Sequence, residues 1–125
     1  MAVVGLQHVQ VNVPLPVEEE AHHFYHSLLG LEEILRPQSL SDAGRRGMWF
    51  RCGEQELHVF CNPNVSFDAA ASSQHPALIV DDLEALRERL ANAGYEIEEA
   101  IPIEGRERFF TRDPGGNRVE FLSFE

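Results

Sequence analysis

The sequence contains no lysine, so all 10 of its basic residues are arginines. The chain therefore lacks the side chain that forms Schiff bases with carbonyl substrates and that often anchors a phosphate. Its 21 acidic residues give a formal net charge of −11. Nucleic acids and anionic membranes attract clustered positive charge. We therefore expect no nucleic-acid partner and no membrane partner.

Cysteines and long hydrophobic runs are also scarce. Cys52 and Cys61 are too few for a disulfide framework, and no Cys-x-x-Cys pair suggests zinc or redox chemistry. No segment approaches the roughly 20 apolar residues of a membrane span, and residues 1–10 do not resemble a signal peptide. These absences predict a soluble, cytoplasmic protein. A chain of 125 residues with 43% hydrophobic content is long enough for one domain with a genuine core.

The hydrophobic pattern predicts short strands and two helices. Residues 5–13 alternate, with valines on one face and polar side chains on the other, as expected for a half-buried strand. Helical spacing follows from Val17 to Leu28, and again from Leu83 to Leu90. The polar residues 37–44 are expected to be a simple connection. The further predicted strands cover residues 31–36, 46–52, 54–61, 74–82, 95–100, 106–112 and 117–124.

The predicted order of one strand, one helix and three strands occurs twice. Landmark residues recur in each half at separations that agree within three residues: His8, Gly30 and His58 in the first half, and His75, Gly94 and Glu120 in the second. This repeat predicts an α+β domain over residues 1–125. Its first module covers residues 1–62, its linker residues 63–73 and its second module residues 74–125.

Glu120 lies among apolar residues in the last predicted strand. Simple alternation would turn it toward water, whereas a position lining a concave site would let its carboxylate bind a ligand. The repeat favours the second interpretation, because His58 occupies the equivalent position in the first half. The pairs Gln7-His8 and Gln74-His75 also open the two halves in the same way.

His8, His58, His75 and Glu120 would approach one centre from separate strands. Imidazole and carboxylate ligands suit a divalent metal such as Zn²⁺, Ni²⁺, Mn²⁺ or Fe²⁺. Without His58 the set becomes two histidines and one carboxylate, which is associated with non-haem Fe²⁺ oxygenases. Glu56 shares the face of His58 and could replace or assist it as ligand or base. The sequence leaves these alternatives open.

Three stretches resemble the vicinal oxygen chelate superfamily, which is also called the glyoxalase, bleomycin-resistance and dioxygenase superfamily. They are GLQHVQVNV, QHPALIVDDLEALRERLANAG and RFFTRDPGGNRVEFLSFE, and together with the intervening residues they cover nearly the whole chain. The resemblance implies two βαβββ modules whose mixed sheets form an open cup around a divalent metal, the glyoxalase-like fold. Carried over by position, His8, His75 and Glu120 match the family's ligands. His58 or Glu56 occupies the fourth position.

The resemblance leaves the reaction open. Classical dioxygenases of this family are commonly twice as long, fosfomycin thiol transferases use lysines that this chain lacks, and metal-free binding members usually lack the ligand set. A glyoxalase-like lyase or isomerase, acting on a small carbonyl compound or its thiol adduct, therefore leads by elimination. The alternatives are an Fe(II) extradiol-type dioxygenase and a bleomycin-resistance-like binding protein without catalysis.

The expected roles of individual residues follow from this resemblance. Glu120 is the first choice for the catalytic base and Glu56 the second. Arg106, Arg108 and Gln10 are the candidate substrate-binding residues, and ordinary exposed charge on an edge strand is the alternative for the two arginines. Family members of this length are generally dimers, so we expect a homodimer. Exchange of modules between subunits would then place ligands of one site on different chains.

Overall fold

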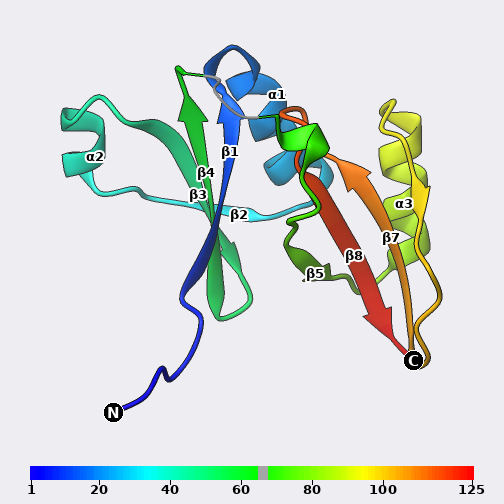
Figure 1. Ribbon diagram of the computed structural model, residues 1–125. Helices are drawn as coiled ribbons and strands as arrows, with labels where there is room; N and C mark the ends of the chain where they lie inside the picture. The colour runs from blue at the N-terminus through cyan, green and yellow to red at the C-terminus, as the bar shows by residue number, and fades with distance from the viewer. Residues whose placement is uncertain (65–67) are drawn as a thin grey trace. The chain divides into compact units, whose positions relative to one another are not determined.

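The computed structural model describes residues 1–64 and 68–125, and the chain divides into two compact units, Met1–Val65 and Ser66–Glu125. Residues 65–67 of the predicted linker lie outside the described residues. Each unit contains one four-stranded sheet (Figure 1). The described residues include no helix that is long and apolar enough to span a membrane.

The sheet of the first unit has the strand order β1-β4-β3-β2. Strand β1 runs parallel to β4, and the other neighbours are antiparallel, so the sheet is mixed. A continuous helical segment connects β1 to β2, and a short helix connects β2 to β3. In chain order the elements are β1 (His8–Pro14), η1 (Leu15–Val17), α1 (Glu18–His22), η2 (His23–Leu28), β2 (Glu32–Ile34), α2 (Gln38–Asp42), β3 (Arg46–Cys52) and β4 (Gln55–Asn62).

The sheet of the second unit repeats this arrangement with the order β5-β8-β7-β6. Strand β5 is parallel to β8, and β8, β7 and β6 are antiparallel neighbours. Its elements are η3 (Ala69–Ala71), β5 (Ala77–Ile79), α3 (Leu83–Asn92), β6 (Glu98–Glu99), β7 (Arg106–Arg112) and β8 (Arg118–Phe124). Two βαβββ units with mixed sheets confirm the predicted α+β, glyoxalase-like fold.

Each unit buries the apolar face of its sheet under its helix. In the second unit, Leu83, Leu86 and Leu90 of α3 are buried, as their spacing predicts, and the helix contacts β8. The side chain of Asp82 accepts a hydrogen bond from the backbone N–H of Ala85 and caps the helix N-terminus. Gly94 follows the helix with φ +91°, a left-handed conformation that glycine adopts without a Cβ clash.

The helical structure of the first unit differs from the prediction in two places. Residues 23–28 form a π-helical turn, in which Tyr25 is buried beside Phe24 and Leu28, the two residues whose helical spacing predicts burial. A pattern with a period of 3.6 residues does not anticipate this wider turn. The expected connection 37–44 contains helix α2, which is too short to produce a periodic signal.

The turn before β8 is built around the carboxylate of Asp113, which is only 4% exposed. One oxygen accepts hydrogen bonds from the backbone N–H groups of Gly115 and Asn117 at 2.9 and 2.8 Å, and the other accepts one from Asn117 Nδ2 at 2.9 Å. Gly116 has φ +87°. The motif Asp-Pro-Gly-Gly-Asn thus forms the predicted tight turn and fixes the start of the strand that carries Glu120.

The two cysteines are free thiols, and their surroundings predict low reactivity toward thiol reagents. Burial, reinforced by the negative charge of Glu18, raises the pKa of Cys61 to about 12, and burial also raises the pKa of Cys52. Because the thiolate is the nucleophile, we expect Cys61 to react with a disulfide reagent at pH 8 roughly 10³-fold more slowly than an ordinary thiol. Spectrophotometric thiol titration should show slow labelling of the folded protein and rapid labelling of both thiols in guanidinium. Fast labelling of two thiols before unfolding would contradict this.

Candidate functional site

The candidate residues of the first unit come from the neighbouring strands β1 and β4. In their parallel register, His8 lies beside Glu56, and Gln10 lies beside His58. Since successive side chains of a strand alternate between its faces, these four residues share the face opposite the buried valines. The structure therefore brings together the predicted histidines and carboxylate of this half of the chain.

Three rings stack across this face. Trp49 of β3 lies flat against His58, with ring centroids 3.9 Å apart, and His8 covers the opposite side at 4.1 Å. His58 is consequently only 5% exposed and presents its ring edges alone. Its Nε2 lies 2.9 Å from Oε1 of Glu56. The hydrogen bond from His58, helped by one from Gln7, lowers the pKa of the Glu56 carboxyl.

His8 is held in a form suited to binding a metal. Its Nδ1 donates to Oε1 of Gln7 at 2.6 Å. This hydrogen bond selects the tautomer in which Nε2 carries the free lone pair. His8 is exposed. The Gln-His pair noted in the sequence thus has a physical role here, because the glutamine orients the imidazole.

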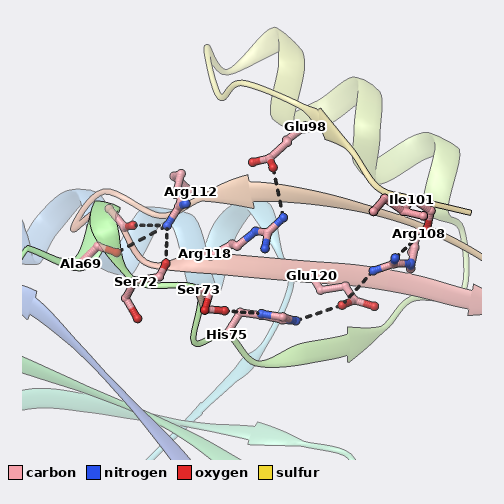
Figure 2. A network of polar contacts seen from close by, with 11 residues as sticks. Ala69, Ser72, Ser73, His75, Glu98, Ile101, Arg108, Arg112, Arg118 and Glu120 are labelled. Carbon is pink, nitrogen blue, oxygen red and sulfur yellow. Dashed lines mark hydrogen bonds and ion pairs between the residues drawn. The ribbon is translucent and has the colours of Figure 1, made fainter.

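In the second unit, His75 and Glu120 face one another (Figure 2). Nε2 of His75 lies 3.1 Å from Oε1 of Glu120, and Nδ1 of His75 donates to the backbone carbonyl of Ser73 at 2.8 Å. Glu120 is only 7% exposed. Its carboxylate is therefore not an ordinary solvent-facing group of an alternating strand. The carbonyl of Pro76, the residue directly before β5, accepts a hydrogen bond from the backbone N–H of Glu120 at 3.0 Å and ties β8 to the segment that leads into β5.

Arg108 contacts the same carboxylate. Its Nη1 lies 3.5 Å from Oε1 of Glu120, and its Nη2 donates to the carbonyl of Ile101 at 2.6 Å, as Figure 2 shows. Its side chain is 13% exposed, and β7 lies between β8 and β6. The alternative of exposed charge on an edge strand is therefore wrong for Arg108. Arg106 lies at the start of β7, where its guanidinium stacks over the ring of Phe124 at 5.1 Å.

The donor atoms of His75 and Glu120 fit a divalent metal. Both ring nitrogens of His75 face oxygens, so a neutral imidazole can satisfy only one of them. His75 and Glu120 would hold a divalent cation together, and the N–H at Nδ1 of His75 would keep its hydrogen bond to the carbonyl of Ser73. Histidines that bind metals usually donate their other ring N–H to such a group. Across the described residues, no group of three or more histidine, cysteine, aspartate or glutamate side chains has the proximity to hold a metal by itself.

Trp49 and Ser73 were not anticipated from the sequence. The contact of Trp49 with His58 depends on the antiparallel register of β3 and β4, in which these two residues are direct partners. Gly53 turns the chain between the strands with φ +62°. A two-residue hairpin loop made of Gly53 and Glu54 would have placed Trp49 opposite His58. No sequence signal identifies the backbone carbonyl of Ser73 as a partner of His75.

Comparisons with known proteins agree with this architecture. A glyoxalase family protein from Bacillus anthracis is 35% identical in sequence and superimposes with a TM-score of 0.85, and the match covers 100% of this chain and 98% of that one. Lactoylglutathione lyase from Agrobacterium tumefaciens is 20% identical, with a TM-score of 0.71 and coverage of 99% and 100%. The fosfomycin resistance protein FosX from Listeria monocytogenes is 16% identical, with a TM-score of 0.77 and coverage of 99% and 94%.

The last two identities are low enough that these proteins indicate a shared fold alone. No curated protein sequence matches the chain. The sequence model of one family matches residues 5–121, nearly the full length, and agrees with the resemblance of the sequence motifs. The chain belongs to the Glyoxalase/Bleomycin resistance protein/Dioxygenase superfamily.

Proposed function

We propose that this chain is a divalent-metal-dependent enzyme of the vicinal oxygen chelate type. Its proposed reaction is that of a glyoxalase-like lyase or isomerase acting on a small carbonyl compound or its thiol adduct. The observation that carries the proposal is the buried carboxylate of Glu120, held 3.1 Å from Nε2 of His75, whose other ring nitrogen is fixed by a backbone carbonyl. Membership of the superfamily supports the same reaction class.

The proposed metal ligands are His8, His75 and Glu120, with His58 or Glu56 as the fourth. Zn²⁺, Ni²⁺, Mn²⁺ and Fe²⁺ all accept nitrogen and oxygen ligands of this kind. When bound, such an ion supplies Lewis acidity that polarises a substrate carbonyl. The protein is further proposed to be a cytoplasmic homodimer that acts on a small molecule.

The residues of the chain would supply the proton transfer. Glu120 is the proposed base, which removes a proton from the carbon next to the carbonyl and returns it to the neighbouring carbon. Arg108 contacts Oε1 of Glu120 and is itself bound to the carbonyl of Ile101, so it restricts the orientation of that carboxylate. Glu56 is the second candidate for the base, because its carboxylate lies beside Nε2 of His58 on the sheet of the first unit.

One alternative activity is favoured by the ligand types. If neither His58 nor Glu56 binds, two histidines and one carboxylate remain, which is the set associated with Fe²⁺ oxygenases. An extradiol-type dioxygenase would then consume O₂ with Fe²⁺ and a catechol, whereas a lyase or isomerase would exchange a proton on its carbonyl substrate. The identity of the bound metal decides which assay comes first.

Elemental analysis of protein purified without a histidine tag tests the proposal. We expect about one Zn, Ni, Mn or Fe per chain in the wild type and its loss in a variant carrying His8→Ala and Glu120→Ala. A matched control carries His23→Ala and Glu19→Ala, which removes one imidazole and one carboxylate from exposed helical positions and should retain the metal. A wild type that holds none of these metals after reconstitution would overturn the proposed function.

A further inference from the structure

A hollow of about 390 Å³ lies on the polar face of the first sheet. This volume falls within the range of small-molecule sites, which is roughly 300–1,000 Å³. Trp49 and His58 of the stacked rings line it, together with Phe60 of β4 and Leu40 of α2. Arg36 and Arg45 also line it, and they flank α2 in the chain. The helix that the sequence did not predict therefore contributes to the lining of a cavity.

The two arginines bring positive charge to this hollow in a chain whose net charge is −11. Nη2 of Arg36 donates to the backbone carbonyl of Arg45 at 2.9 Å, which closes the segment around α2 and keeps the two residues together. Nε of Arg36 is buried and finds no hydrogen-bond partner among the described residues.

Five other arginines of the described residues form ion pairs with carboxylates. Arg46 forms two hydrogen bonds with Glu18, and Arg118 forms one with Glu98. Within residues 1–64 and 68–125, neither Arg36 nor Arg45 forms an ion pair with a carboxylate, although the chain has 21 acidic residues. Guanidinium groups that line a cavity and have no carboxylate partner favour a ligand carboxylate, which an arginine binds with two parallel hydrogen bonds.

The rest of the lining favours a planar or apolar body attached to that carboxylate. The guanidinium of Arg45 lies over the ring of Phe60, 4.3 Å from its centroid, so charge and aromatic surface lie side by side. Leu40 and Trp49 add apolar surface. Glu56 adds a negative charge to the lining. Its carboxylate is hydrogen-bonded to His58 at 2.9 Å and forms an ion pair with Arg51 at 3.8 Å.

We propose that this hollow binds a small organic carboxylate with a planar or apolar body. Arg36 and Arg45 bind its carboxylate, and Phe60, Leu40 and Trp49 contact its body. The other end of the ligand then faces the edge of the hollow formed by His8 and His58. That this ligand is the enzyme's substrate rests on the proposed function, whereas its binding to the arginines does not require a metal.

Trp49 is the only tryptophan of the chain, so its fluorescence reports on the hollow directly. The probes are phenylacetate and its uncharged amide, phenylacetamide, titrated into metal-free protein prepared with a chelator. We expect phenylacetate to change the fluorescence saturably, and phenylacetamide to bind at least about tenfold more weakly, because it lacks the charge that the arginines recognise. Arg36→Gln and Arg45→Gln should each raise the Kd for phenylacetate by about tenfold or more.

Arg89→Gln is the charge-matched control, since Arg89 lies on α3 and does not line the hollow. It should leave the Kd unchanged. Equal affinity for the two probes, unchanged binding in the Arg36→Gln, Arg45→Gln double variant, or no fluorescence response to phenylacetate would each overturn the proposal. Metal-containing protein that fails to respond would overturn this inference and leave the proposed function standing. If phenylacetate binds to a chain that never takes up metal, this inference stands and the proposed function is overturned.

Discussion

Replacing Glu120 by glutamine is expected to lower the affinity of the protein for its divalent metal by about 100-fold or more and to abolish turnover. The substitution keeps the shape of the side chain but replaces an anionic oxygen ligand with a neutral amide, which is a much weaker ligand for these metals. It also removes the proposed base and the ionic partner of Arg108. Competition with a chromogenic chelator measures the affinity of the apo protein for each ion.

Glu107→Gln is the matched control for this experiment. This substitution makes the same chemical change on β7. The side chain of Glu107 is exposed and lies on the face of the strand opposite Arg108. Its metal affinity and its turnover should equal those of the wild type. If Glu120→Gln and Glu107→Gln bind the metal equally well, Glu120 is not a ligand, and the proposed site must be abandoned.

Replacing Gly47 by alanine is expected to destabilise the protein by about 3 kcal/mol or more, because the new methyl group has no space. A Cβ at this position would overlap the carbonyl oxygen of Val59, and it would lie 3.3 Å from the carbonyl carbon of Val59 and 3.4 Å from Cα of Phe60. These are backbone atoms of β4. They can move only by disturbing the pairing that positions His58.

Denaturant titration followed by circular dichroism measures this change in the free energy of unfolding. Gly5→Ala is the control, because a Cβ there meets nothing within 4 Å and the residue has no left-handed φ. It should be neutral to within about 0.5 kcal/mol. A Gly47→Ala variant as stable as Gly5→Ala would show that β3 and β4 separate easily at this point.

The fold was predictable because two independent signals agreed. Alternation placed Val11 and Val13 on the buried face of β1, and helical spacing placed Leu86 and Leu90 in the core of the second unit. The repeated order of elements then predicted two similar sheets, which the strand orders bear out. Helix α2 escaped prediction because five residues do not reveal a period.

For the candidate site, the sequence predicted which side chains share one face of a strand, but not which of them contact each other. Alternation groups His58 with Glu56 without knowledge of the register, because both lie on one strand. The contact between Arg108 and Glu120 depends on the conformation of a long side chain, and the stacking of Trp49 on His58 depends on the pairing of two strands. The short loop between β3 and β4 indicates the second contact, whereas nothing in the spacing of residues along the chain indicates the first.

The parallel pairing of β1 with β4 and of β5 with β8 has a consequence for how the chain folds. In the described residues, the first strand of each unit pairs with the last strand of that unit, so each sheet is completed by a contact between residues far apart in sequence. Bringing such distant residues together lowers the conformational entropy of the chain before the strand contacts stabilise it. Folding is therefore slower than in chains built from local hairpins. During synthesis, β1 therefore remains an unpaired strand until β4 has left the ribosome.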